Sequence, residues 1–281
     1  MVTPSPPPPR IVILDNDQTT GDYTIFFKWL YWLEAAYVHK YIDIIPIITV
    51  FTKIFEQNQI FRPGLKPFLR RLAELKREKK IDYIVIYTNQ LETHDPIYDK
   101  NGAPITIPFL LQIMYNCLAE ESIIDLRLTR PLDSDSPIKS FSRVFNALRI
   151  PIHLGASKTL FFDDLIEHCP ETDDIGFSEN GHVRVADYRA PFDPNLFLRL
   201  CRLTISIVEK NSRGIYKRSM AGQDLHLARA LTEVMETVLF DELCTPYRLC
   251  VKNFGDPRKH GFSKYIDRVE KTFNDNDLIE V

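Results

Sequence analysis

Acidic and hydroxyl side chains follow three short apolar runs of this sequence, and they are the residue types from which a metal-dependent reaction can be built. The runs are residues 11–14, 83–87 and 159–162. The polar residues that follow them are Asp15, Asp17, Thr19, Thr88, Asp163 and Asp164. Carboxylates crowded into one place repel one another unless a cation is present, and hard oxygen ligands suit Mg²⁺. The pattern therefore predicts a magnesium site built from distant parts of the chain.

A magnesium site of this kind favours phosphoryl transfer. The ion would screen the negative charge of a substrate, so that a carboxylate can approach a phosphoryl group. Asp15 is the candidate nucleophile, which would attack phosphorus and form an aspartyl-phosphate. Asp17, two residues further on, is the candidate acid and base, which would protonate the leaving oxygen and later deprotonate the attacking water.

These residues can meet only if the apolar runs are neighbouring strands. Continuous apolar runs are typical of strands buried on both faces of a parallel sheet. A helix is predicted at 65–75, where leucines and a phenylalanine recur at helical spacing before the second run. Because sites in such sheets form outside the carboxyl ends of the strands, the acidic residues are expected to converge. The predicted fold is α/β, a Rossmann-like parallel sheet flanked by helices, with a weaker strand at 183–185 and a closing helix at 194–208.

The chain is predicted to have three parts. Residues 1–10 form a proline-rich, disordered tail, residues 11–208 form the catalytic domain, and residues 209–281 form a helical C-terminal extension. Within the domain, the aromatic-rich stretch 23–61 is expected to form helix plus irregular structure. Residues 101–137 are expected to form a small insert of strands and a helix at the edge of the core, which would act as a short cap.

Composition excludes several classes of protein. The 281 residues have an ordinary globular balance, with 44% hydrophobic and 26% charged residues. A net charge of −3 argues against a general nucleic-acid binder. The most apolar region, 25–55, is interrupted by charged residues and is a poor membrane span. Five cysteines without a CxxC pair, and no visible signal peptide, predict an intracellular protein of the cytoplasm or nucleus.

Several motifs resemble those of the haloacid dehalogenase superfamily. The segment 11–19, IVILDNDQT, resembles its motif I, although Asn16 stands where that motif usually has an apolar residue. Thr88 in IVIYTNQ resembles motif II, and the acidic pair after TLFF resembles motif IV. The chain is most similar to the RNA polymerase II C-terminal-domain phosphatase family, also called NLI-interacting-factor-like. That similarity comes from RPGLKPFLRRL at 62–72, THDPIYDK at 93–100 and KSFSR at 139–143.

The resemblance implies an HAD-like fold over residues 10–208 and a metal-bound nucleophile. Asp15 would be the nucleophile and a metal ligand. Asp17 would be the acid and base, and its backbone carbonyl would be a second ligand. In this family the second residue of the motif IV pair commonly meets the metal, so Asp164 is favoured over Asp163 as the third ligand.

The resemblance also implies groups that hold the substrate. Thr88 would hold a phosphate oxygen, and Lys139 would pair with the phosphate and with Asp15. Thr19 and Asn89 are predicted as further substrate contacts. Lys158 is the rival for the lysine role, but it is better interpreted as a solvated residue at a strand start.

The leading functional prediction is a Mg²⁺-dependent phosphoserine/phosphothreonine phosphatase with a phosphoprotein substrate. The expected short cap predicts an open site, which suits a bulky substrate. The sequence TNQ at 88–90 is more similar to polynucleotide 3′-phosphatases and small-molecule phosphatases, so a nucleic-acid end or a metabolite is the alternative substrate. A further alternative is a binding module that keeps the fold without turnover, but the motif I aspartates weigh against it. A receiver-like domain fits poorly, because its acidic pair is adjacent.

Overall fold

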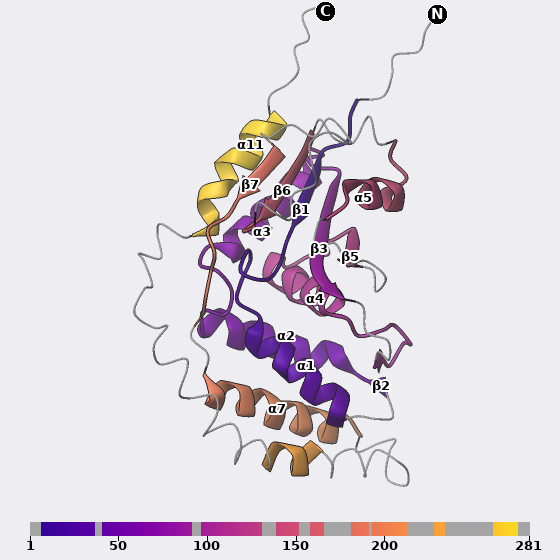
Figure 1. The fold of residues 1–281 in the computed structure, drawn as a ribbon, viewed down its shortest axis with the longest axis vertical. Coiled ribbons are helices and arrows are strands. Elements are labelled where there is room, and N and C mark those ends of the chain that lie inside the picture. The colour runs from indigo at the N-terminus through magenta and orange to yellow at the C-terminus, as the bar shows by residue number, and fades with distance from the viewer. Residues whose placement is uncertain are drawn as a thin grey trace, which may run out of the picture.

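The computed structural model describes residues 7–36, 41–91, 97–130, 139–151, 158–165, 181–190, 193–212, 228–233 and 261–274. Its centre is a sheet of five parallel strands in the order β5-β3-β1-β6-β7 (Figure 1). The strands are β1 (Ile11–Leu14), β3 (Tyr83–Leu91), β5 (Leu126–Arg130), β6 (Thr159–Asp163) and β7 (His182–Arg184). This confirms the predicted α/β class with a parallel sheet flanked by helices.

The central strand β1 shows why the apolar runs are continuous. All four of its residues are fully buried, because side chains alternate between two covered faces. Val12 and Leu14 belong to the larger core beneath α3 (Leu65–Arg77) and α4 (Ile107–Ala119). Ile11 and Ile13 belong to the smaller core beneath α5 (Phe141–Leu148) on the opposite face.

Helix α3 follows from its sequence in a simple way. Gly64 precedes it with a φ of +83°, a left-handed conformation that glycine adopts without strain. One face of the helix is buried, and it carries Leu65, Phe68, Leu69, Leu72, Ala73 and Leu75. Lys76 and Arg77 lie in the last turn, where a positive charge favours the helix dipole.

Further helices lie beyond the carboxyl ends of the strands (Figure 1). They are α1 (Thr24–Ala36), α2 (Ile44–Gln57) and α7 (Pro194–Ser212), and α1 and α2 each pack against α7. The indole Nε1 of Trp29 donates a hydrogen bond of 3.0 Å to Thr204 Oγ1, which joins α1 to α7. A two-stranded ladder of β2 (Tyr41–Ile42) and β4 (Tyr98–Asp99) lies beside this group.

The end of the chain returns to the sheet. A 3₁₀ turn, η6 (Phe262–Tyr265), leads into α11 (Ile266–Asn274), which lies near α3 and β7 (Figure 1). Phe262 packs against Phe68 and Phe162, with ring centroids 4.5 Å and 5.8 Å away. The segment 261–274 of the C-terminal extension therefore covers the core, whereas most of the helical extension predicted at 209–281 lies outside the described residues.

The structure corrects the predicted insert at 101–137. Ile107–Ala119 is α4, which packs on β3 and β5, and Leu126–Arg130 is the edge strand of the main sheet. The described part of this segment is thus a βαβ crossover rather than a cap, because its apolar helix face and strand complete the core. The expectation of an open site stays a prediction. A second difference is that β3 extends to Leu91, so Thr88 and Asn89 lie within the strand rather than after it.

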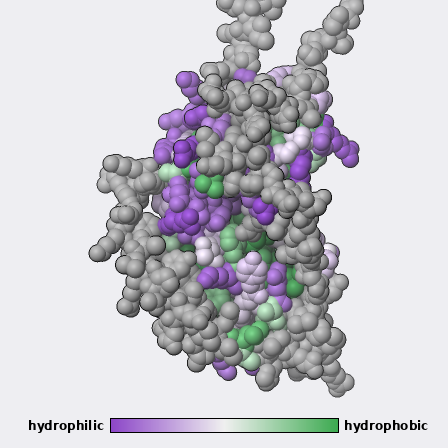
Figure 2. Space-filling view, in the orientation of Figure 1, coloured by the Kyte–Doolittle hydropathy of each residue, from purple (hydrophilic) through white to green (hydrophobic). Residues whose placement is uncertain are grey.

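The surface of the described residues is mixed. Figure 2 shows hydrophilic residues over the upper part of the molecule and hydrophobic residues in the lower part, where α1, α2 and α4 lie. Tyr31 on α1 and Ile45 on α2 are among the large hydrophobic side chains that are exposed. Among the described helices, none combines the length and the apolar character that a bilayer crossing needs.

Candidate active site

The carboxyl ends of β1 and β6 bring the two acidic segments together. The strands are parallel, and Leu14 is in register with Phe162. Asp15 and Asp163, the next residues along the two strands, therefore lie side by side. The backbone N–H of Asp15 donates to the Phe162 carbonyl at 2.9 Å. The parallel register is the physical reason why residues separated by 148 positions (163 minus 15) meet.

Three carboxylates form a buried acidic cluster at this edge. Asp15, Asp163 and Asp164 each offer one oxygen, and these oxygens all lie within 4.8 Å of one another. The three residues are 6%, 0% and 7% exposed. Such proximity is unfavourable for ionised carboxylates without a cation, and it is the arrangement from which Mg²⁺ sites are made.

Lys139 supplies a cation to the acidic cluster from the segment before α5. It is 1% exposed, and its Nζ lies 2.6 Å from Asp15 Oδ1 and 2.5 Å from Asp163 Oδ2. One ammonium therefore pairs with two of the three carboxylates of the cluster. The predicted pairing of Lys139 with Asp15 is present, whereas Lys158 stands before the first residue of β6, at the end of the strand away from Asp163.

Thr19 links the loop after β1 to the acidic cluster. Its Oγ1 lies 2.8 Å from Asp164 Oδ1 and 3.2 Å from Asp15 Oδ2. A hydroxyl has one proton to donate, so the shorter contact identifies Asp164 as the main acceptor. The backbone N–H of Asp164 in turn donates to Thr19 Oγ1 at 3.0 Å. Thr19 thus orients the metal-ligand candidate Asp164, and its predicted substrate contact stays a prediction.

Burial and mutual repulsion shift the titration of the cluster. Burial raises the pKa of Asp15 to about 7; the charge of Lys139 opposes this rise, and Asp163 and Asp164 add to it. The pKa of Asp164 is also raised, mainly by burial. Burial acts to lower the pKa of Lys139, but Asp15 and Asp163 outweigh it, so the ammonium stays charged. The site is therefore short of positive charge.

Asp17 lies in the same loop but outside the three-carboxylate cluster. Its Oδ1 accepts a hydrogen bond of 3.4 Å from the backbone N–H of Tyr23. Burial raises the pKa of Asp17 to about 6, and the charge of Asp22 adds to this effect. A carboxyl group whose pKa is raised toward neutrality can hold a proton for a leaving group, which is what a general acid requires.

The strand β3 carries the remaining predicted residues. Leu14 is in register with Ile86, so Thr88 lies two residues further along, at the level where the loop after β1 begins. Thr88 is 2% exposed, and Asn89 is half-buried. Within the part of the chain that the structure describes, the buried Nδ2 of Asn89 has no hydrogen-bond acceptor.

A group of hydroxyls beside the loop was not predicted from the sequence. Tyr115 on α4 donates to Asn16 Oδ1 at 3.1 Å and lies 2.5 Å from Thr20 Oγ1. Tyr23 adds its own hydroxyl, 3.1 Å from Thr20 Oγ1. This network satisfies the Oδ1 of the fully buried Asn16, whereas its Nδ2 has no hydrogen-bond partner among the described residues. Nothing in the local sequence around Tyr115 signals the contact, because 99 residues separate it from Asn16.

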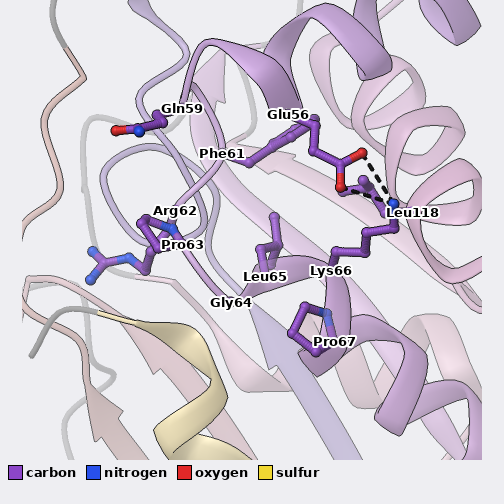
Figure 3. Close-up of a pocket in the computed structure, with 10 residues that line it drawn as sticks. All are labelled: Glu56, Gln59, Phe61, Arg62, Pro63, Gly64, Leu65, Lys66, Pro67 and Leu118. Atoms are coloured by element: carbon purple, nitrogen blue, oxygen red, sulfur yellow. Dashed lines mark hydrogen bonds and ion pairs between the residues drawn. The ribbon is translucent and has the colours of Figure 1, made fainter. Parts of the chain in front are cut away.

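A pocket of about 340 Å³ lies near this loop, between the end of α2 and the start of α3 (Figure 3). Lys66 and Glu56 form an ion pair of 2.9 Å across it. The side chain of Arg62 points away from the other lining side chains (Figure 3). None of the predicted catalytic residues lines this pocket.

No family model, curated protein or solved structure matches the chain. The buried acidic cluster with its lysine lies at the carboxyl edge of a parallel α/β sheet, the place where ligands bind in such sheets.

Proposed function

We propose that the chain is a Mg²⁺-dependent phosphomonoester hydrolase of the HAD-like type, which acts through an aspartyl-phosphate on Asp15. The observation that supports this most directly is the buried acidic cluster of Asp15, Asp163 and Asp164, two of which pair with the ammonium of Lys139. The motif resemblance makes a phosphoseryl or phosphothreonyl protein the leading substrate class.

The residues of the acidic cluster fit a magnesium ion. Three carboxylates and one ammonium leave a deficit of two positive charges, which a divalent cation would remove. All donor atoms are hard oxygens, the kind that Mg²⁺ prefers. Asp163 has both oxygens engaged, by Lys139 and by the Leu165 N–H, whereas the side-chain donor to Asp164 is Thr19, which bonds its Oδ1. Asp15 and Asp164 are therefore the proposed carboxylate ligands, with the Asp17 carbonyl as a third.

The proposed reaction has two displacement steps at phosphorus. In the first, an Asp15 oxygen attacks, the ester P–O bond breaks, and the leaving oxygen takes the proton of Asp17. In the second, water attacks the aspartyl-phosphate, its proton passes to Asp17, and inorganic phosphate leaves with the Asp15 carboxylate restored. The bound ion would neutralise charge on the phosphoryl oxygens and so reduce their repulsion of Asp15.

Other residues would hold the phosphoryl group. Lys139 keeps Asp15 oriented and supplies positive charge where the transition state needs it. Thr88 and Asn89, on the neighbouring strand, are proposed donors to the phosphoryl oxygens. The orphan Nδ2 of Asn89 supports this role, because a buried donor without an acceptor is costly and would gain one on binding.

Hydrolysis of an aryl phosphate by the purified full chain tests the proposal, with and without Mg²⁺. We expect turnover that depends on the ion and falls at least about 10³-fold in Asp15→Asn, because the nucleophile is lost. Asp82→Asn is the matched control, since Asp82 is an exposed carboxylate paired with Arg10 at the amino end of β3. Equal turnover in wild type and Asp15→Asn, or no need for Mg²⁺, would refute the proposed chemistry.

The same assay discriminates the substrate classes. A phosphoserine peptide, a 3′-phosphorylated oligonucleotide and a small sugar phosphate are compared by kcat/KM. Preference for the peptide supports the leading class, and preference for either other substrate replaces it. A folded protein that binds Mg²⁺ but hydrolyses none of them would support the binding-module alternative.

A further inference from the structure

Arg62 is a large buried side chain whose contacts lie on the loop of the candidate active site. It is 1% exposed, although arginine is rarely found inside proteins. Its Nε donates to the carbonyl of Thr19 at 2.6 Å, and one terminal nitrogen donates to the carbonyl of Gln18 at 2.6 Å. The same nitrogen also donates to the carbonyl of Ala186, in the segment after β7. The guanidinium therefore ties two segments together through backbone oxygens.

These contacts act on residues that carry the chemistry. Thr19 accepts from Arg62 through its carbonyl, while its hydroxyl holds Asp164. Gln18, which has a φ of +61°, follows Asp17 directly. A non-glycine residue with positive φ is kept in place only by its surroundings, and Arg62 is one of the groups that bind its carbonyl. The position of the loop 15–22 thus depends on a side chain that does not belong to the acidic cluster.

Backbone contacts add to this fixation. The Arg62 N–H donates to the Thr20 carbonyl at 2.9 Å, and the Asp22 N–H donates to the Ile60 carbonyl at 3.0 Å. From the other side, the Tyr188 N–H donates to the Gln18 carbonyl at 3.0 Å. The loop is therefore held between the segment before α3 and the segment after β7, with the Arg62 side chain joining both.

The C-terminal segment 261–274 covers Arg62. The guanidinium carbon lies 5.2 Å from the centroid of the Tyr188 ring and 6.0 Å from that of Phe262. The Phe262 N–H donates to the Pro63 carbonyl at 2.7 Å, next to Arg62 in sequence. Phe262 itself is fully buried. Removing this ring would open the guanidinium to water, which competes for the same carbonyl bonds.

We propose that Arg62 is a positioning residue for the metal-binding loop and that the C-terminal segment, through Phe262, keeps it in place. This inference builds on the proposed function, because it assigns the loop a metal-binding role. It gives the C-terminal extension a task in the reaction rather than a separate activity. Arginine suits the position because its planar fork reaches several carbonyls at once, which the single ammonium of lysine does not.

Mg²⁺ binding and amide hydrogen exchange, measured on the full chain, test the proposal without turnover. Arg62→Met keeps an apolar stem of similar length but removes every side-chain donor. We expect the Kd for Mg²⁺, measured by titration calorimetry, to rise about 10- to 100-fold, as is typical when a group that orients metal ligands is lost. Hydrogen exchange of peptides covering 15–22 should become faster in the metal-free protein, and Arg62→Lys should restore only part of the protection.

Phe262→Ala and Phe273→Ala form a matched pair. Both remove a buried ring of the C-terminal segment, and Phe273 belongs to the same hydrophobic core as Phe262. Both variants should lower the Tm. Only Phe262→Ala should weaken Mg²⁺ binding and expose the loop 15–22 to exchange, and Phe262→Leu should be milder.

The outcomes separate this proposal from the proposed function. If the wild-type protein binds no Mg²⁺, the proposed metal site is refuted. Amide hydrogen exchange of the loop 15–22 would still test whether Arg62 positions that loop. A folded Arg62→Met variant with wild-type exchange at 15–22 overturns the positioning role, whatever the metal affinity. Equal effects of Phe262→Ala and Phe273→Ala on the loop would reduce the C-terminal segment to a general stabiliser. If Arg62→Met does not fold, Arg62→Lys and Phe262→Leu carry the same comparison.

Discussion

Replacing Lys139 by methionine is the perturbation with the clearest energetic consequence. The change keeps the length and apolar stem of the side chain and removes the charge. In the absence of metal it leaves Asp15 and Asp163, which lie beside Asp164, without the ammonium that pairs with them. The variant should therefore lose stability, and the loss should depend on pH and on Mg²⁺.

The distances set the magnitude. Two ion pairs at 2.6 Å and 2.5 Å would each be worth about 6 kcal/mol at an effective dielectric constant of about 20. The cost of burying the charges offsets much of this, and breaking one partner of a buried pair typically costs about 3–5 kcal/mol. For a chain of this size such a loss corresponds to a fall in Tm of roughly 10 °C.

The sign of the pH dependence follows from Asp15. Burial raises its pKa to about 7 in the folded protein, well above the ordinary value of 3.8. Its protonated form therefore favours the folded state, and this contribution is lost as pH rises from about 4 through 7. Below pH 7 Asp15 is largely neutral, so the Lys139 charge stabilises it less. Lys139→Met should therefore lower the free energy of unfolding less at pH 6 than at pH 8.5.

Thermal and urea unfolding at these two pH values, with a chelator or with Mg²⁺, measure the effect. Mg²⁺ should stabilise the variant more than the wild type, because it supplies the missing positive charge. Lys158→Met is the control, since Lys158 precedes β6 at the end away from Asp163, and it should change stability by less than about 1 kcal/mol. A loss in Lys139→Met that is the same at both pH values and insensitive to Mg²⁺ would refute the electrostatic reasoning.

Three further predictions concern the loop after β1. Asp17→Asn should lower kcat by about 10²- to 10⁴-fold, because the general acid is lost. Burial raises the pKa of Asp17 to about 6, so the wild-type kcat/KM should fall above that pH. If the variant's kcat/KM still falls above that pH, the general acid is another residue. Thr19→Val should weaken Mg²⁺ binding by about tenfold, because Asp164 loses its hydroxyl donor, whereas Thr19→Ser should bind nearly as wild type. Gly21→Ala should lower the free energy of unfolding in urea by a few kcal/mol, since the added Cβ would lie 2.6 Å from the Ile60 carbonyl oxygen. Gly102→Ala is the control: its φ is +81° and nothing lies within 4 Å of the added Cβ, so the loss should be only about 1 kcal/mol. Equal losses in the two variants would contradict the steric argument.

The corrected elements show where sequence reasoning fails. The segment 101–137, which includes this crossover, contains several prolines and alternating apolar residues, a pattern that also suits an inserted cap. Periodicity reports that a helix has an apolar face, but it does not report which surface that face covers. The packing of α4 on β3 and β5 decides the question, because burial there completes the main core.

The bond between Thr19 and Asp164 could not be read from the sequence for a similar reason. The DxDxT pattern indicates that a hydroxyl lies near the acids, yet it does not give the direction of the side chain. In the structure the hydroxyl faces Asp164, 145 residues away, because the loop 15–22 is bound on both sides by the segments at 60–62 and 185–190. A partner so remote in sequence leaves no local signal.

The sequence by itself determined the parallel sheet and the acidic residues at its carboxyl edge. Continuous apolar runs specify buried strands, and polar residues that end such runs must lie at one edge, so local chemistry was sufficient. Only the tertiary structure decided that Arg62 binds the loop carbonyls and that Phe262 covers Arg62. Those contacts join residues 43 to 200 positions apart (62 minus 19, and 262 minus 62). They depend on how separate elements pack, which no spacing within one element encodes.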